Sequence, residues 1–377
     1  MAQKDSNHDH ADDPEDEKKV SENTRLLFGT LKEDILPAAE KELIWNRILE
    51  YVHVNDNTVQ DKPFGRVIWY QAAAAIALLV LVGLGYSKLK PNREEEMLAA
   101  AKQVSFNSAD TQLLLDDKRT IDLKGENSDV VYQNEVIRLD SQTIARQITV
   151  AQKPGLNTLV VPFGKRSTIT LPDGTKIWLN SGSKLVYSSD FQNGKRQVFL
   201  EGQAYFSVTH DTENPFYVQT KNMNVKVLGT EFDVSSYDDD SRSYAVLAQG
   251  SIELATEKDA LFGPKKTTLI PGTRAEYGEL SKGVRIARVN VEDYISWKEG
   301  YLKFTNTPLN EILKKLSRYY KYDLSVQNAE VGEETFSGTL DLQENIEHVL
   351  DVISTTTSLS YHKTERRFIL EKGATKE

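Results

Sequence analysis

The clearest pattern in the chain is a long, mostly apolar stretch from Val67 to Ser87. It contains no charged residue, and bulky aliphatic side chains fill its second half. As an α-helix it would be roughly 31 Å long, enough to cross the hydrocarbon core of a bilayer. Trp69, Tyr70 and Tyr86 lie near its ends, where amphipathic rings prefer the headgroup region. The pattern predicts one transmembrane helix, residues 67–87, with a small part before it and a large part after it on opposite sides of a membrane.

Two other interpretations of this stretch fit less well. A buried core helix rarely runs this long without a charge. A cleaved signal peptide would begin near the start of the chain rather than at Val67. The transmembrane interpretation is therefore preferred.

The part before this stretch is predicted to be a tail and two short helices. Residues 1–23 are polar and acidic, which is typical of a disordered tail. Residues 24–66 contain two amphipathic segments, separated at Pro37, and a linker to the membrane. Two short helices cannot enclose a core, so either they pack loosely on each other or their apolar face binds a partner. The residues of that face are Leu26, Leu27, Leu31, Leu43, Ile44, Ile48 and Tyr51.

After the membrane, residues 88–112 form a juxtamembrane segment with a short helix at Asn92–Lys102, and from about Gln112 the apolar period becomes two. Short strands separated by turn residues predict an all-β sandwich, roll or barrel over residues 113–291. Leu113–Leu123 and Ile169–Leu179 both read as strand, turn and strand, either as an internal repeat or as two hairpins of one type. Further predicted strands are Val198–Leu200, Ala204–Val208, Phe216–Thr220, Val225–Leu228, Phe232–Tyr237, Tyr244–Ala248 and Ser251–Leu254.

Residues 294–372 combine both periods and predict a small α+β domain of order β-α-β-β-α-β. Its first helix is expected to begin with Thr307 as N-cap and Pro308 as the first helical residue. Its second helix is expected to begin with a capping box made by Asp341 and Glu344. The predicted fold is thus multi-domain, with short N-terminal helices, one transmembrane helix, an all-β domain and this α+β domain.

Composition narrows the function. The net charge of −10 and the pI of about 5.3 argue against direct nucleic-acid binding. The absence of cysteine excludes disulfides, thiolate zinc sites and cysteine nucleophiles. The sequence also lacks a phosphate-binding glycine loop, His-Glu-x-x-His and Gly-x-Ser-x-Gly. No enzyme site, metal site or cofactor is predicted, and Asp238, Asp239 and Asp240 are expected to form a solvated turn because they lack the spacing of a calcium loop.

One dipeptide, Gly229-Thr230, has two interpretations. It could be a glycine at a bulge or tight bend between two strands, which is the preferred interpretation. It could instead be a self-cleavage site, at which the Thr230 hydroxyl attacks the Gly229 carbonyl to give an ester that water hydrolyses. Glu231, Asp233 or a distant residue could then act as the base.

Several stretches resemble the FecR family of transmembrane anti-sigma factors, in the form common in Bacteroidetes-type bacteria. They are Asn157–Gly164, Leu171–Tyr187, Arg196–Val208, Asn214–Thr220 and Val225–Tyr237. Trp297–Tyr320 resembles the C-terminal domain of those proteins, which is itself similar to the short signalling domain of secretins and TonB-dependent receptors. The positions that carry the family motif are Pro172, Asp173, Gly174, Trp178, Leu179, Asn180, Gly202, Phe206, Pro215, Phe216, Gly229, Thr230 and Phe232.

The resemblance implies a function in signal transduction and transcription regulation. Such proteins lie in the inner membrane with a cytoplasmic N-terminus that holds an extracytoplasmic-function sigma factor. Their periplasmic part senses the signalling domain of an outer-membrane TonB-dependent receptor, and envelope proteases then release the sigma factor. Some members of the family split at a Gly-Thr in the position of Gly229-Thr230. The charges that flank the apolar stretch do not decide the orientation, which is therefore taken from the resemblance.

Two other functions remain open. The chain could be a membrane-anchored module that binds envelope polysaccharide or peptidoglycan, for which Trp178 is the candidate contact. It could also be a membrane-bound hydrolase, which the missing catalytic motifs argue against.

Overall fold

The computed structural model describes residues 42–44, 46–47, 93–133, 136–140, 146–149, 155–188, 196–256, 266–278 and 283–373. The chain divides into two compact units, Met1–Leu89 and Lys90–Glu377. Among the described residues no helix has the length and apolar character needed to cross a bilayer. The predicted transmembrane residues 67–87 lie outside the described part, so their prediction is not tested here.

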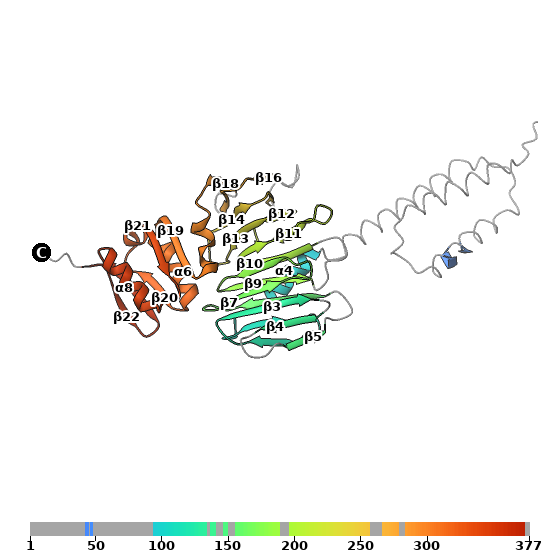
Figure 1. The fold of residues 1–377 in the computed structure, drawn as a ribbon, viewed down its shortest axis with the longest axis horizontal. Helices are drawn as coiled ribbons and strands as arrows, with labels where there is room; N and C mark the ends of the chain where they lie inside the picture. Colours follow the sequence, from blue (N-terminus) through green and yellow to red (C-terminus); the bar gives the residue numbers. More distant parts are fainter. Residues whose placement is uncertain are drawn as a thin grey trace, which may run out of the picture. The chain divides into compact units, whose positions relative to one another are not determined.

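The larger part of the second unit is a sandwich of two β-sheets (Figure 1). Sheet A has the strand order β2-β1-β6-β9-β10-β11-β12-β15-β16. Its pairs are antiparallel except for β10 with β11. The bounds are β1 Thr111–Leu114, β2 Thr120–Leu123, β6 Leu156–Val161, β9 Ser183–Ser188, β10 Arg196–Ser207, β11 Phe216–Gln219, β12 Asn224–Val227, β15 Ile252–Ala255 and β16 Lys266–Leu269.

Sheet B has the order β5-β4-β3-β7-β8-β10-β13-β14-β17-β18 and shares β10 with sheet A. Its pairs are antiparallel except for β3 with β7. The bounds are β3 Asn127–Gln133, β4 Val136–Asp140, β5 Arg146–Thr149, β7 Arg166–Thr170, β8 Lys176–Leu179, β13 Glu231–Ser236, β14 Arg242–Gln249, β17 Thr273–Gly278 and β18 Gly283–Arg288. The all-β prediction is confirmed, although the hairpin β3–β4 was not singled out from the sequence.

Strand β10 changes from one sheet to the other at Gly202. Its first half pairs with β9 in sheet A, and its second half, from Gly202 to Ser207, pairs with β13 in sheet B. Gly202 has φ +107°, and a Cβ atom there would lie 2.4 Å from the Ser183 hydroxyl oxygen. Only glycine fits such a bend without strain. The two strands predicted for this stretch are therefore one strand with a change of sheet.

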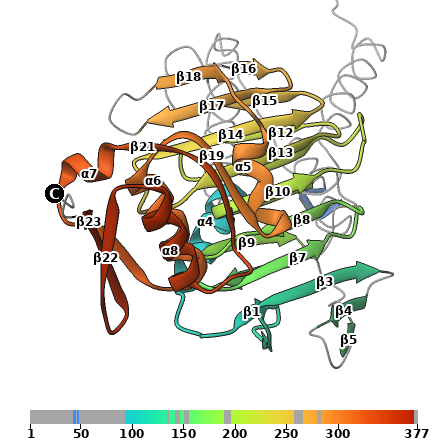
Figure 2. The same cartoon turned by 60° about the vertical axis from the view of Figure 1, so that its left-hand side comes forward.

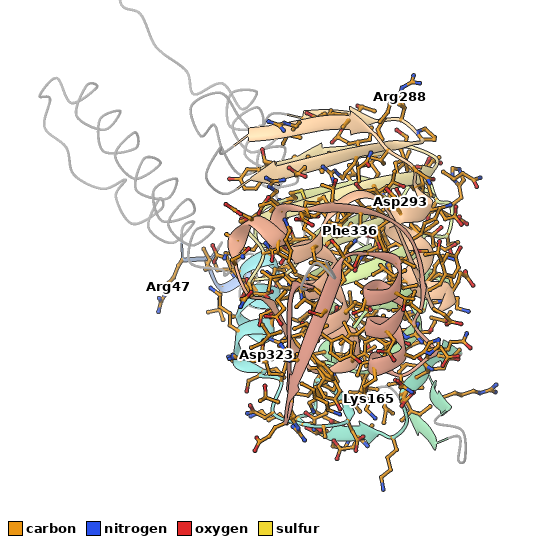
Figure 3. The ribbon with its side chains drawn as sticks, turned by 90° about the vertical axis from the view of Figure 1, so that its left-hand side faces the viewer. Arg47, Lys165, Arg288, Asp293, Asp323 and Phe336 are labelled. Carbon is orange, nitrogen blue, oxygen red and sulfur yellow. The ribbon has the colours of Figure 1, made fainter. Side chains whose placement is uncertain are left out.

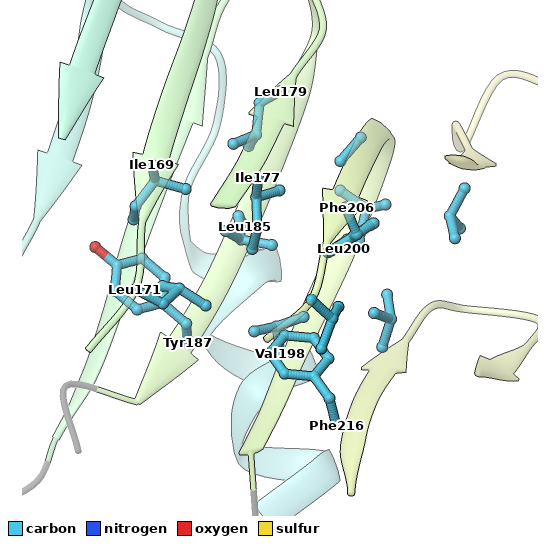
Figure 4. Packing of buried hydrophobic residues seen from close by; sticks show 14 of the residues in the cluster. Ile169, Leu171, Ile177, Leu179, Leu185, Tyr187, Val198, Leu200, Phe206 and Phe216 are labelled. Atoms are coloured by element: carbon cyan, nitrogen blue, oxygen red, sulfur yellow. The ribbon is translucent and has the colours of Figure 1, made fainter. Parts of the chain in front are cut away.

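The core lies between the two sheets and is almost entirely apolar (Figure 4). Phe206 stacks on Phe232 with ring centroids 4.9 Å apart and contacts Phe216 edge-on at 6.4 Å. All three rings are fully buried. Truncating one of them should cost about 3–5 kcal/mol of unfolding free energy, because the cavity would not close.

The two predicted hairpins are of one type. In the first, the Leu115 N–H bonds to the Arg119 carbonyl and the Lys118 N–H to the Leu115 carbonyl. In the second, which includes Pro172-Asp173-Gly174, the same two bonds join Leu171 to the residues three and four positions later. Lys118 and Gly174 both have positive φ, +69° and +81°. The hairpins lie in different sheets, β1–β2 in A and β7–β8 in B.

The C-terminal part has its own core. A two-stranded sheet, β19-β21, and a three-stranded sheet, β20-β23-β22, pack against α6 and α8. The small α+β domain is thus confirmed, including the two closing strands predicted at Leu359–His362 and Arg367–Leu370, and the short helix α7 was not predicted. The bounds are α5 Glu292–Ile295, η1 Ser296–Glu299, β19 Tyr301–Pro308, α6 Leu309–Tyr320, β20 Asp323–Val326, α7 Ala329–Glu333, β21 Thr335–Asp341, α8 Ile346–Thr356, β22 Leu359–Thr364 and β23 Arg367–Lys372.

Both predicted helix starts in this domain were wrong by a few residues. Thr307 still pairs with β21, so the N-cap of α6 is Pro308. The N-cap of α8 is Asn345, whose side chain accepts a hydrogen bond from the His348 N–H. Asp341 accepts from the Gln343 N–H instead.

Helix α4, Arg93–Gln103, confirms the helix predicted at Asn92–Lys102 and packs on the outer face of sheet A. Met97 and Ala101 are fully buried against Val186 of β9 and Phe199 of β10. Arg93 Nη2 also donates to the Ser188 hydroxyl at 2.8 Å. The helix is therefore part of the second unit.

Candidate functional site

Polar side chains gather at the centre of the outer face of sheet B. Strand register places Trp178, Tyr205, Asp233 and Arg274 in one row that crosses β8, β10, β13, β14 and β17, with Val246 of β14 between Asp233 and Arg274. Neighbouring positions such as Val234 point into the core, as the alternation of a strand requires. Burying a polar row costs free energy unless each group finds a partner.

Residues 292–321 supply those partners, and we call this contact the junction. Figure 2 shows α5, β19 and α6 in front of the strands of sheet B. The Trp297 Nε1–H donates to Asp233 Oδ1 at 3.2 Å. Arg274 Nη1 donates to the hydroxyl of Tyr294 in α5 at 2.7 Å. The preceding residue of this helix, Asp293, is labelled in Figure 3. The junction thus joins the sandwich to the C-terminal domain.

Asp233 is the buried centre of the junction. It has no exposed surface. Its Oδ2 accepts a hydrogen bond from Gln203 Nε2 at 3.0 Å. Burial raises the pKa of this carboxyl to about 7, although the bonds from Gln203 and Trp297 and the charge of Lys315 act in the opposite direction. A carboxyl with this pKa changes its charge near neutral pH.

Lys315 of α6 faces the same region. Burial lowers the pKa of its amine, and the nearby charges of Glu311, Asp233 and Asp293 partly offset this effect. Its Nζ lies 6.0 Å from the Tyr294 ring centroid. A cavity of about 30 Å³ is lined by Gln203, Trp297, Lys315 and neighbouring residues, which is room for an ordered water.

Arg318 forms an ionic clamp at the edge of the junction. Its Nη2 lies 2.7 Å from both Asp239 Oδ1 and Asp240 Oδ1, and its guanidinium carbon lies 3.6 Å from the Tyr237 ring centroid. Burial alone would raise the pKa of Asp240, but Arg318 and Lys314 hold it below its usual value. The predicted turn at Asp238, Asp239 and Asp240 is confirmed and its first two side chains are exposed, but Asp240 is half-buried because Arg318 of α6 pairs with it.

The junction is polar and charged rather than an apolar core. Contacts of this composition within one chain resemble transient protein–protein interfaces. Truncating one partner of such a pair leaves the other charge desolvated and unpaired. The arrangement can therefore hold the C-terminal domain on the sandwich and respond to a change in charge or contacts at either side.

Trp178 lies at the rim of the junction, beside a cavity of about 270 Å³ that Trp297, Lys298 and Gln343 also line. The Lys176 and Lys298 Nζ atoms lie 4.9 and 5.9 Å from the Trp178 ring. The ring is half-buried and is packed by ammonium groups. A sugar that stacked on this ring would compete with these ammonium groups.

Gly229-Thr230 links β12 to β13. A Cβ atom on Gly229 would lie 2.5–2.7 Å from Nδ1, Cα and Cβ of His210. The buried Thr230 hydroxyl donates to the Ser251 carbonyl at 3.0 Å. Tight packing therefore gives a structural reason for glycine here, and His210, which the sequence did not indicate, is the histidine beside it.

The remaining residues of the family motif build the sandwich. Asp173 caps its own turn by accepting from the Thr175 N–H at 3.0 Å, and it pairs with the buried Arg196 at 3.0 Å. Asn180 donates to the Gln203 side chain at 2.9 Å and so supports the junction. The others that contribute to turns, bends or the core are Pro172, Gly174, Leu179, Gly202, Phe206, Pro215, Phe216 and Phe232.

The residues predicted to bind a sigma factor lie mostly outside the described part of the chain. Leu43 and Ile44 are described. They are helical and have 64% and 49% of their surface exposed. The residues that stay outside are Leu26, Leu27, Leu31, Ile48 and Tyr51.

Sequence reasoning missed the residues that form the junction. Asp233 occupies an outward position of its strand, which predicts exposure. Lys315 and Arg318 occupy positions of α6 away from its row of leucine and isoleucine residues, which predicts that their side chains face solvent. The one available signal was that a charged residue lies between two apolar residues of β13, Phe232 and Val234.

Comparisons with known proteins agree with the two folded parts. The family model described as FecR protein matches residues 157–253, and the model described as FecR, C-terminal matches residues 301–370. No curated protein matches the sequence.

Two crystal structures of a candidate anti-sigma factor from Parabacteroides distasonis, at 1.65 and 2.50 Å resolution, resemble the chain with 28% identity. They cover 58% of this chain and 99% and 100% of theirs, with TM-scores of 0.52 and 0.53. Both family models match in order on the sandwich and the α+β domain, so the chain belongs to the FecR family.

Proposed function

We propose that this protein is a single-pass anti-sigma factor of the inner membrane. Its N-terminal residues 24–66 hold an extracytoplasmic-function sigma factor in the cytoplasm. Its second unit lies in the periplasm and receives the signal of a TonB-dependent receptor through residues 294–372. The similarity of both folded parts to the candidate anti-sigma factor from Parabacteroides distasonis is the observation that carries the proposal.

Features of the described residues agree with this function. Leu43 and Ile44 expose apolar surface on a helix, as a segment does that docks in a groove of a partner. The junction joins the proposed receptor-binding domain to the sandwich through polar contacts that can rearrange. Envelope proteases would act after that rearrangement.

Co-purification tests the sigma-factor partner. Full-length tagged protein should retain a sigma factor that mass spectrometry identifies. Leu43→Asp with Ile48→Asp should abolish the interaction, because an unpaired charge would be buried in the complex. Asn46→Asp adds a charge to the same helix without removing an apolar side chain and serves as the control. Equal recovery with the double variant would refute the proposal.

The alternative, a module for envelope polysaccharide, is less well supported. It relied on Trp178 as an open stacking surface, and that ring is packed by Lys176 and Lys298. If Trp178→Ala left the affinity of the protein for envelope glycan unaltered, the remaining reason for the polysaccharide-binding function would be removed.

A further inference from the structure

The turn between β6 and β7, Pro162–Lys165, contacts the C-terminal domain through its backbone. The Gly164 N–H donates to the Arg318 carbonyl at 2.9 Å. Gly164 has φ +79°, and a Cβ there would lie 3.5 Å from Lys321 Cβ. The turn therefore holds the last turn of α6, the helix that carries the ionic clamp.

The side chains of the same turn contact the segment that follows α4. Phe163 stacks on Phe106 with ring centroids 6.0 Å apart and planes at 29°. Lys165 Nζ lies 3.6 Å from Asp110 Oδ1. Between α4 and β1 the backbone has only local hydrogen bonds among those observed, so these side-chain contacts tie the segment to the sandwich.

Phe106 connects this contact to the docking face of α4. The Lys184 Nζ lies 4.6 Å from the Phe106 ring and pairs with Glu201 at 3.0 Å. Register places Lys184 and Glu201 two residues along from Val186 and Phe199, on the same outer face of sheet A. Those two residues are the ones on which α4 packs.

A second chain of contacts runs from Arg318 to the same turn. The Arg318 guanidinium packs on the Tyr237 ring, and the Tyr237 hydroxyl donates to the Ser181 carbonyl at 2.9 Å. The Ser181 hydroxyl in turn donates to the Lys165 carbonyl at 2.7 Å. Both routes from α6 thus end at Pro162–Lys165.

We infer that the Pro162–Lys165 turn couples the C-terminal domain to the docking of α4 on sheet A. A displacement of α6 removes the Gly164 bond and the Tyr237 packing, which loosens Phe163 on Phe106 and then α4. Energetic coupling of this kind passes through contiguous packed and hydrogen-bonded groups. Its use in signalling rests on the proposed function, whereas the coupling itself does not.

Hydrogen exchange tests the coupling on the full chain in detergent micelles. Arg318→Gln should accelerate exchange of the α4 amides by roughly 5- to 150-fold, the usual range of coupling between sites. Phe163→Ala should also accelerate exchange of the α4 amides. In the double variant the acceleration should be no more than about twofold greater than the larger of the two single accelerations, because both changes act on the same route. Arg367→Gln and Ile286→Ala are matched controls, since these residues lie exposed and outside the route.

Coupling is reciprocal, so Phe163→Ala must also accelerate exchange in the last turn of α6. Phe163 is 37% exposed, and its truncation should leave the amides of β13 and β14 protected. This variant keeps the test decisive if Arg318→Gln unfolds the protein. The inference would be overturned if Phe163→Ala left the exchange rates of the α6 amides unchanged. It would also be overturned if the acceleration in the double variant equalled the product of the two single accelerations. No sigma factor is present, so a failed co-purification and a failed coupling are distinct results.

Discussion

Trp297 donates its indole N–H to the Asp233 carboxylate, and the two residues are 64 positions apart, one in η1 and the other in β13. The carboxylate lies on the sandwich and the indole on the segment that leads into the C-terminal domain. The bond therefore exists only while the domain is seated on sheet B. Its strength depends on the charge of one buried group.

The first prediction concerns pH. The pKa of Asp233 is raised to about 7 in the folded protein, so between about pH 4 and pH 7 the folded state binds a proton that the unfolded state does not. The free energy of unfolding should therefore fall as the pH rises through this window, by an amount on the order of a few kcal/mol. Asp233→Asn removes this proton and should flatten that part of the dependence, as measured by urea unfolding at a series of pH values.

The difference between the pH profiles of the wild type and of Asp233→Asn isolates the contribution of Asp233 to the free energy of unfolding. Lys315, whose pKa is lowered, adds stability with rising pH only above its folded pKa and is present in both proteins. Parallel pH profiles for the two proteins would mean that Asp233 is charged throughout the window.

The second prediction concerns the ionic clamp. Arg318→Ala leaves the Asp240 carboxylate partly desolvated without its partner and should lower the free energy of unfolding by about 1–3 kcal/mol. Arg367→Ala breaks an exposed pair with Asp323 and should cost about 0.5 kcal/mol or less. Equal costs for the two variants in urea unfolding would show that the clamp is solvated.

The third prediction concerns Gly229-Thr230. Because the Thr230 hydroxyl is bonded to Ser251 and Gly229 is required by packing, wild type and Thr230→Ala should each give one full-length band on a denaturing gel. Gly229→Ala should cost about 1–3 kcal/mol through overpacking against His210. Gly338→Ala, whose Cβ would meet nothing closer than 3.7 Å, is the control. Two fragments from the wild type but not from Thr230→Ala would establish self-cleavage instead.

The fourth prediction concerns topology. Reporter fusions after Asn57 and after Thr158 should report the cytoplasm and the periplasm respectively, and the reverse pattern would contradict the proposed orientation. Leu79→Arg should weaken membrane insertion, because arginine at the centre of a helix costs about 2.5–3.5 kcal/mol on insertion scales.

The fifth prediction concerns removal of residues 294–372. The sandwich core contains no residue of this range, so the remaining sandwich should keep a cooperative unfolding transition while signalling changes. Circular dichroism and a sigma-dependent reporter measure the two effects. Loss of the transition would mean that the sandwich depends on the C-terminal domain for folding.

Local chemistry predicted much of this fold. Pro172-Asp173-Gly174 predicted its hairpin because proline and glycine fix the dihedral angles of the turn. The apolar positions of α6 predicted its buried face, with Leu309, Ile312, Leu313 and Leu316 in the core. These features depend on residues a few positions apart, which a single sequence displays.

The junction depended on contacts that no local pattern contains. Asp233 alternates with Phe232 and Val234, so it reads as a solvent-facing residue, and only the C-terminal domain buries it. The polar turn at Asp239 and Asp240 was predicted, but their ion pairs with Arg318 were not, since this partner comes from a later helix. The change of sheet at Gly202 could not be predicted either. Glycine is found both at bends within a strand and at turns between two strands, so the sequence does not distinguish them.

The passage of β10 through both sheets has a consequence for how the protein folds. Neither sheet is complete until Arg196–Ser207 has been placed, and the neighbours of this strand come from both earlier and later parts of the chain. Pairings between segments far apart in the sequence slow folding, because the entropy of closing each loop is lost before contacts form. A newly made chain would therefore remain open to chaperones and proteases at least until β13 has been made, because β10 cannot complete its pairing in sheet B before then.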